Sequence, residues 1–209
     1  MTTRIELIDE CLVMNGMDPL GSEQAPGADT HIACFMSATR LILSCHPWNC
    51  NSFIRQLNRK TDPPSPAHWQ YAFELPTELI GEPRALYPSK DCRVPTTRFE
   101  YVGEVNAPLR EVRCDHEELW CRGPWMAPPS VWPGYLTEVI KLLVRSELAM
   151  SVREDRIMRD DLRADAIGSG MTVMQGGLLG TARSLNDMAK PSAVIADNYN
   201  PLIAARTGG

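Results

Sequence analysis

The sequence has no apolar run long enough to cross a membrane, and its first residues lack the features of an export signal. About eighteen consecutive apolar residues are needed to span a bilayer, and the apolar runs of this chain are much shorter. Met1–Glu10 is polar and amphipathic, without the apolar core of a secretory leader. We therefore expect a protein that is assembled in the cytoplasm and has no membrane partner.

The chain also has no excess of basic residues. Its 26 acidic residues outnumber its 21 Lys and Arg residues, which gives a formal net charge of −5. A domain that grips nucleic acid needs a basic face. This balance argues against a DNA-binding surface that extends over the whole domain, although it is compatible with a local basic patch.

Motifs of familiar catalytic sites are missing. The stretch Ile167–Thr172 lacks the G-x-S-x-G frame of a nucleophile turn. The glycines of "QGGLLG" are not followed by the Lys and Ser or Thr of a phosphate-binding loop. None of the four histidines stands in a catalytic pattern. We expect no catalytic residue, no cofactor and no resident metal, and hence no enzyme.

The seven cysteines raise the question of a metal site. An odd number of cysteines fits free thiols in a reducing compartment better than a disulfide framework. In "SCHPWNC", Cys45 and Cys50 are five residues apart, which on a helix separates them by roughly 140°. We therefore expect both to be small buried hydrophobic residues and not ligands of one ion.

A second group of possible ligands lies later in the chain, in and around "CDHEELWC". No CxxC or HxxxH pair supports a zinc site there. It nevertheless provides the alternative functional hypothesis, a cytoplasmic metal-assisted enzyme that would use Cys92, Cys114, His116 and Cys121.

Prolines divide the chain. Most of the 17 lie between Pro63 and Pro133, and none lies between Gly134 and Ala189. Because proline is excluded from helix interiors and central strands, we predict an α+β fold, a helical-bundle core with a small antiparallel β region inserted between the helices. The predicted parts are N-terminal helices (1–62), a proline-rich β region (63–130), a long C-terminal helix (131–168), and a Gly-rich joint with an extended C-terminal arm (169–209).

Apolar spacing predicts the two front helices. Thr2 or Thr3 caps a first helix that stops at Asn15-Gly16, where both residues tolerate left-handed backbone. Asp29 or Thr30 caps the second helix. After a break or restart at Pro47, helical spacing continues from Trp48 to about Asn58.

Apolar spacing in the later part of the chain predicts a third helix from Trp132 to about Ala166. Its first part carries a broad apolar stripe. Its second part, from Arg153, carries both signs of charge, including an Asp155/Arg159 pair, and is expected to be a solvated continuation or a surface for ion pairs between subunits. The glycines that follow indicate a flexible joint, and residues after Ser184 indicate an arm with little core of its own.

Short strands are predicted between the helical parts. "WQYAFELP" alternates in the manner of a strand. Two candidates near the end of this region, Glu111–Cys114 and Leu119–Arg122, are close enough to form a hairpin, which would make Cys114 and Cys121 neighbours. The other candidates are Arg84–Tyr87 and Thr97–Gly103.

Large aromatic residues are the expected anchors of this arrangement. Trp48 is predicted to pin the helical core to the β region, together with aromatic side chains near it and in the first long strand. The complete set of predicted structural anchors is Trp48, Phe53, Trp69, Tyr71 and Phe73.

The order of these features resembles a known family, the head–tail adaptor proteins of tailed bacteriophages, often called tail tubular protein A. The resemblance rests on an N-terminal helix and turn, a helix running into an aromatic block, a strand of aromatics running into Leu-Pro, and a later apolar-striped helix with a tail. The corresponding stretches are "IELIDECLVMNGMDPL", "HPWNCNSFIRQL", "HWQYAFELPTELI", "RFEYVG", "YLTEVIKLLVRSELAMSV" and "DNYNPLIAAR".

The resemblance implies a structural virion protein in the neck between capsid and tail. Such adaptors form a ring, usually a dodecamer, between the portal protein and the next tail or nozzle protein, and genomic DNA passes through the ring without specific binding. A ring of identical subunits needs heterologous interfaces, and an acidic lumen repels phosphate. The arm expected to dock on the portal contains Tyr199, Asn200, Pro201, Leu202 and Ile203.

Overall fold

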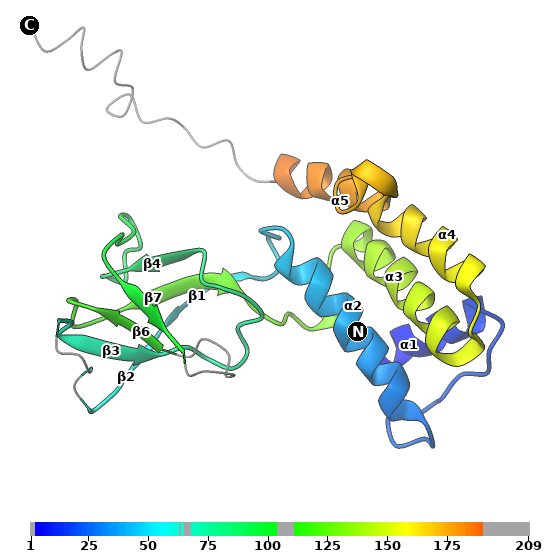
Figure 1. Cartoon of the computed structure of the whole chain (residues 1–209), viewed down its shortest axis with the longest axis horizontal. Helices are drawn as coiled ribbons and strands as arrows, with labels where there is room; N and C mark the ends of the chain where they lie inside the picture. Colours follow the sequence, from blue (N-terminus) through cyan, green and yellow to red (C-terminus); the bar gives the residue numbers. More distant parts are fainter. Residues whose placement is uncertain (1–2, 63, 65–67, 104–110, 190–209) are drawn as a thin grey trace, which may run out of the picture.

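Two bodies of different architecture lie side by side in the molecule (Figure 1). The computed structural model describes residues 3–62, 64, 68–103 and 111–189. One body is a bundle of α-helices, and the other is a pair of small antiparallel sheets that the chain enters after its second helix and leaves before its third. The predicted α+β class is thereby confirmed.

The bundle consists of helices from both ends of the described chain. The two longest, α2 and α3, pack against each other, and α3 also contacts α1, α4 and α5. The helices are α1 (Arg4–Met14), α2 (Ala28–Ser44), α3 (Gly134–Arg153), α4 (Arg156–Ile167) and α5 (Gly177–Met188).

The ends of α1 follow the local rules of the sequence. Thr3 and Glu6 form a capping box, in which the Glu6 amide donates to Thr3 Oγ1 at 3.3 Å and the Thr3 amide donates to Glu6 Oε2 at 2.8 Å. Asn15 ends the helix, and Gly16 follows with φ of +71°. For α2 the predicted cap at Asp29 or Thr30 was wrong, since the helix begins at Ala28 and is preceded by Gly27 in left-handed conformation.

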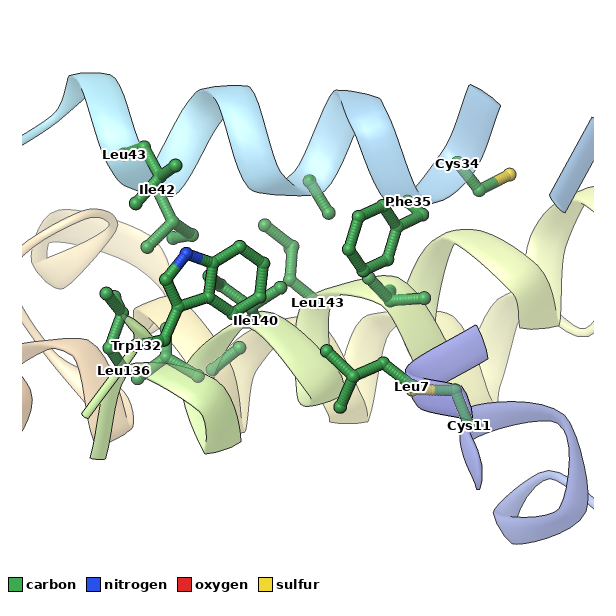
Figure 2. Packing of buried hydrophobic residues seen from close by; sticks show 14 of the residues in the cluster. Leu7, Cys11, Cys34, Phe35, Ile42, Leu43, Trp132, Leu136, Ile140 and Leu143 are labelled. Atoms are coloured by element: carbon green, nitrogen blue, oxygen red, sulfur yellow. The ribbon is translucent and has the colours of Figure 1, made fainter. Parts of the chain in front are cut away.

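Apolar faces of α1, α2 and α3 form the larger core. Figure 2 shows Phe35 and Ile42 on α2 facing Ile140 and Leu143 on α3, with the indole of Trp132 between these helices. Leu143 is fully buried. These helices therefore owe their stability mainly to the burial of one face, at about 25 cal/mol for each Å² of apolar surface removed from water.

The charged continuation of the third helix is a separate helix. Glu154 adopts a left-handed conformation (φ +54°) and ends α3, and Asp155 caps α4 by accepting from the Met158 amide at 3.0 Å. The chain reverses there, so that α4 packs along α3 (Figure 1). Asp155 is thus used as a cap, and the predicted ion pair with Arg159 is wrong: Arg159 pairs with Asp160 at 2.6 Å.

The glycine-rich stretch is a tight turn instead of a flexible joint. A Cβ atom on Gly168 would lie 2.6 Å from the Thr172 carbonyl oxygen, and one on Gly177 would lie 2.6 Å from the Asp165 carbonyl oxygen. Both glycines also have positive φ. Close approach of the backbones therefore requires glycine here. The predicted arm was also wrong up to Met188, because α5 packs on α3 and α4 with Leu179 and Ala182 buried.

The β region is made of two antiparallel sheets. One has the order β1-β7-β4, and the other has the order β2-β3-β6-β5. The strands are β1 (Ser52–Gln56), β2 (Asn58–Arg59), β3 (Tyr71–Glu74), β4 (Ala85–Tyr87), β5 (Glu100–Val102), β6 (Glu111–Cys114) and β7 (Trp120–Pro124). The predicted β segments at residues 69–74, 84–87, 97–103 and 111–114 each contain one of these strands, and the predicted segment at 119–122 overlaps β7, which continues to Pro124.

The helix predicted from Trp48 to Asn58 was wrong, because this segment forms β1 and β2. The Leu57 amide donates to the Leu119 carbonyl at 2.8 Å, and the Trp125 amide donates to the Asn51 carbonyl at 3.0 Å. These bonds hold the segment against β7, so pairing with a distant strand overrides the local helical spacing. The β region consequently begins at Ser52, earlier than the predicted residue 63.

The predicted hairpin of β6 and β7 was also wrong. β6 pairs with β3 and β5, whereas β7 pairs with β1 and β4, so the short connection between them passes from one sheet to the other. A second core forms between the sheets, and Cys114 and Cys121 both belong to it. Its buried residues are Leu57, Phe73, Leu75, Leu86, Val112, Cys114, Leu119, Cys121 and Trp125.

Candidate functional site

The turn that contains "HPWN" lies where the bundle meets the β region. Residues 45–51 leave the end of α2 and lead directly into β1. Trp48 is fully buried in the core of the bundle, and its indole Nε1 donates to the Ile42 carbonyl at 2.6 Å. The ring of His46 stands edge-on to the Trp48 ring, with 4.8 Å between centroids. Trp48 therefore fixes this turn on the last turn of α2.

Polar bonds tie the same turn to α5. The Asn49 amide donates to Asn186 Oδ1 at 2.9 Å, and Asn49 Nδ2 donates to the Asn186 carbonyl at 3.1 Å. Arg183 Nη2 donates to the Cys45 carbonyl at 3.2 Å. Asn186 is buried, so its bonds are shielded from water. The last described helix is thereby held to the junction between the two bodies.

The other predicted anchors do not join Trp48. Phe73 is buried in the β-region core, and Tyr71 packs at the edge of that core. Trp69 is partly buried, and its Nε1 donates to Glu100 Oε2 at 2.7 Å. Phe53 is 49 % exposed on β1. The prediction that these aromatics pin the two bodies together is therefore wrong, because each core has its own aromatic residues.

The four residues of the metal hypothesis do not form a ligand set. Among the residues that the structure describes, no group of three or more His, Cys, Asp or Glu side chains is placed to hold a metal ion. Cys114 and Cys121 are buried in an apolar core, and His116 Nε2 lies 3.1 Å from Thr96 Oγ1. The Cys92 thiol donates to the Ser89 carbonyl at 3.6 Å.

Burial holds the thiols of Cys11, Cys50 and Cys121 in their neutral form. All seven cysteines are free. Burial raises the pKa of Cys11 and of Cys121 to about 12, and burial raises the pKa of Cys50 to about 11. Because the thiolate is the reactive species and the metal ligand, these side chains behave as small hydrophobic residues. The prediction that Cys45 and Cys50 lie on one helix was nevertheless wrong, because α2 ends at Ser44, before both residues.

A polar cavity of about 510 Å³ opens on the second sheet. Glu111 bridges two cations there, with Oε2 at 2.5 Å from Lys60 Nζ and Oε1 at 2.6 Å from Arg113 Nε. Burial raises the pKa of Glu111, but the hydrogen bonds from Lys60 and Arg113 outweigh it and hold this pKa below its usual value. The described lining also includes Arg59, Asp62 and Glu74, so that three cations and three carboxylates balance in this cavity.

Strand β1 is an edge strand that carries apolar side chains. Alternate residues of β1 bond to β7, which leaves the backbone groups of Ser52, Ile54 and Gln56 facing away from the sheet. Phe53 and Ile54 are 49 % and 43 % exposed. In the described part of the chain no strand covers this edge. Such an edge is suited to pairing with another polypeptide.

Apolar side chains are also exposed on α1 and α4, at the end of the bundle where α1 ends beside the α3–α4 turn. Arg153 Nη1 donates to the Asn15 carbonyl, which holds these segments together. Val13, Met14 and Ile157 are 58 %, 51 % and 77 % exposed. Exposed apolar side chains at one end of the bundle suit contacts with another protein.

The predicted arm residues Tyr199, Asn200, Pro201, Leu202 and Ile203 lie outside the described residues. No described helix combines the length and the apolar character that a membrane span requires.

Sequence reasoning missed two features of the junction. Asn186 and Arg183 belong to a segment predicted to be an arm, although the spacing of Leu179, Ala182 and Asn186 is helical. Arg84 and Arg122 line a cavity at the junction, and no sequence motif relates them. Only the pairing of β4 with β7 brings these two arginines together.

Comparison with known proteins identifies no relative: no family model matches the chain, and a search of curated proteins returns no match.

Proposed function

We propose that this protein is a head-to-tail adaptor of a tailed bacteriophage, a structural virion protein without catalytic activity. In this role it forms a ring, a dodecamer by analogy with the family that the sequence resembles, between the portal and the downstream tail or nozzle protein. It acts in the neck of the virion after assembly in the host cytoplasm.

The observation that carries the proposal is the insertion of a separate β region between α2 and α3. One chain thus presents a helical body and a β body, each with its own buried core. An adaptor needs two such bodies, because one must pack against identical neighbours while the other meets a different protein. In the proposed ring the bundle forms the subunit contacts, and the β region faces the tail.

Two exposed apolar surfaces favour assembly. The edge of β1 with Phe53 and Ile54 belongs to the β body, and the end of the bundle with Val13, Met14 and Ile157 belongs to the helical body. Because a ring uses two different patches on each subunit, surfaces on opposite bodies suit head-to-tail contacts and contacts with partners.

The charge of the chain suits a conduit for DNA. A net charge of −5 disfavours tight binding to phosphates. The predicted portal-docking arm lies after Ala189, and the described helix before it, α5, is bonded to the junction between the two bodies through Asn186.

Mass measurement and electron microscopy of the purified full-length chain, alone and mixed with the portal protein of the same virus, test the proposal. We expect rings with an open centre in the mixture, bound coaxially to the portal. A chain that stays monomeric in both samples, or that binds elsewhere on the capsid, would refute the adaptor role.

A further inference from the structure

A cavity of about 370 Å³ lies between the "HPWN" turn and the first sheet. Asn49 and Ser52 contribute polar groups from the turn side. Arg84, Tyr87 and Arg122 contribute the opposite wall from β4, β7 and the residue before β4. Among the described residues that line the cavity, the only charged side chains are the two arginines. The cavity is therefore cationic, in a chain whose net charge is negative.

Strand pairing forces the two arginines together. Ala85 is opposite Arg122 in the β4–β7 register, and the Arg84 amide donates to the Arg122 carbonyl at 2.8 Å. Arg84 Nη2 donates to the His46 carbonyl at 2.6 Å, and Arg122 Nε donates to Ser52 Oγ at 3.2 Å. Neutral acceptors thus position both guanidinium groups, and neither forms an ion pair with a carboxylate of the described residues.

The charge of Arg84 is poorly compensated. Its Nη1 is buried and has no hydrogen-bond partner in the described part of the chain. Burial and the nearby Arg122 together lower the pKa of Arg84. Burying a cation without a counter-charge is costly. An anion in the adjacent cavity would offset that cost, and guanidinium groups match the geometry of carboxylate and phosphate groups.

We propose that this junction cavity is an oxyanion-binding site, in which Arg84 and Arg122 together take one carboxylate or phosphate group. Asn49 and Ser52 supply further polar groups beside the anion. The assignment depends on the geometry of the cavity alone and holds whether or not the protein is a phage adaptor.

The carboxylate or phosphate group that binds in this cavity can come from two sources. One is a free inorganic anion such as phosphate. The other is an acidic side chain of a second copy of this chain, which has more carboxylates than basic groups. The cavity adjoins the turn that is bonded to α5, so an acidic side chain seated there would place the partner copy against both bodies of the subunit.

The first measurement is the thermal unfolding midpoint of the full-length chain as phosphate replaces chloride at constant ionic strength. A ligand that binds the native state raises the midpoint in proportion to its occupancy. We expect a rise for wild type, and an apparent Kd weakened about tenfold or more in Arg84→Gln and in Arg122→Gln, since each removes a charge-assisted hydrogen bond.

Arg98→Gln is the matched control. It removes the same charge from a residue outside the cavity, next to β5 of the second sheet, where Arg98 is 3.4 Å from Asp115, and should respond to phosphate as wild type does. Arg122→Gln keeps the test decisive if Arg84→Gln does not fold, because the Arg122 side chain is exposed and carries no buried bond.

The second measurement is self-association by sedimentation velocity, with and without phosphate. Association that weakens in both variants and that phosphate competes away assigns the oxyanion to a second copy. A phosphate response without any effect on association assigns a free anion. The proposal is overturned if phosphate has no effect beyond chloride, or if the variants respond to phosphate as wild type does.

Discussion

Replacing Trp48 with alanine tests how the bundle holds the turn that leads into the β region. The side chain is fully buried, with 0 % of its surface exposed, and it lies within the larger core. Truncation of a buried Trp to alanine costs about 3–5 kcal/mol, because apolar burial is lost and a cavity remains. We expect the free energy of unfolding to fall by this amount.

Part of this cost belongs to the hydrogen bond from Trp48 Nε1 to the Ile42 carbonyl. The bond is 2.6 Å long and buried. A buried hydrogen bond contributes roughly 1 kcal/mol net, and the Ile42 carbonyl keeps a second donor, the Cys45 thiol at 3.2 Å. Trp48→Phe, which keeps most of the apolar area, should therefore cost only about 1–2 kcal/mol.

Phe53→Ala is the matched control for the anchor hypothesis. Phe53 is 49 % exposed on β1. Full burial of such a side chain stabilises the fold by about 1.5–3 kcal/mol, so we expect the truncation of this half-buried side chain to lower the free energy of unfolding by roughly 1 kcal/mol. Urea denaturation followed by far-UV circular dichroism measures all three variants with the same signal. The reasoning is refuted if Trp48→Ala costs no more than Phe53→Ala, or if Trp48→Phe costs as much as Trp48→Ala.

Further predictions concern the junction, the ion network, the C-terminal segment and the cysteines. Asn186→Ala should cost about 1–3 kcal/mol in urea denaturation, by removing buried bonds to the turn, and should speed amide exchange in α5 more than in α3. The pKa of Glu111 is lowered on folding, so its network stabilises the fold above the unfolded pKa of about 4.3 and is lost as the pH falls through the folded value. The stability gap between wild type and Glu111→Gln should accordingly shrink between neutral and acidic pH, and a constant gap would contradict this. Truncation after Ala189 should leave thermal unfolding unchanged but abolish portal binding in a pull-down, whereas retained binding would remove the arm from the proposal. Purified protein should contain no stoichiometric zinc by elemental analysis, and zinc that disappears in Cys114→Ser would revive the metal hypothesis.

Local signals in the sequence predicted much of the fold. The cap at Thr2 or Thr3, of which the structure uses Thr3, the stop at Asn15-Gly16 and the apolar stripe of α3 each depend on residues within one or two turns. Proline placement predicted that β structure lies between helices, because proline is excluded from helix interiors. These features concern chain neighbours, and neighbours determine caps, turns and periodicity.

The segments that the sequence assigned wrongly are those whose backbone conformation depends on tertiary contacts. Residues 52–59 have helical spacing but pair with strands that lie more than ten residues away in the chain. Glu154 has no special backbone preference for a left-handed turn, yet packing of α4 on α3 requires it there. The glycines at 168 and 177 indicated flexibility, whereas close backbone approach requires them.

The sequence by itself determined the α+β class, the order of helical and β parts, the caps of α1 and the packing role of most cysteines, because these depend on composition and short-range spacing. Only the tertiary structure decided that "HPWN" is a turn between two cores, that α5 is bonded to it through Asn186, and that Arg84 and Arg122 share a cavity. The physical reason is that strand register and helix packing join residues many positions apart, and no local pattern of side chains encodes those distances.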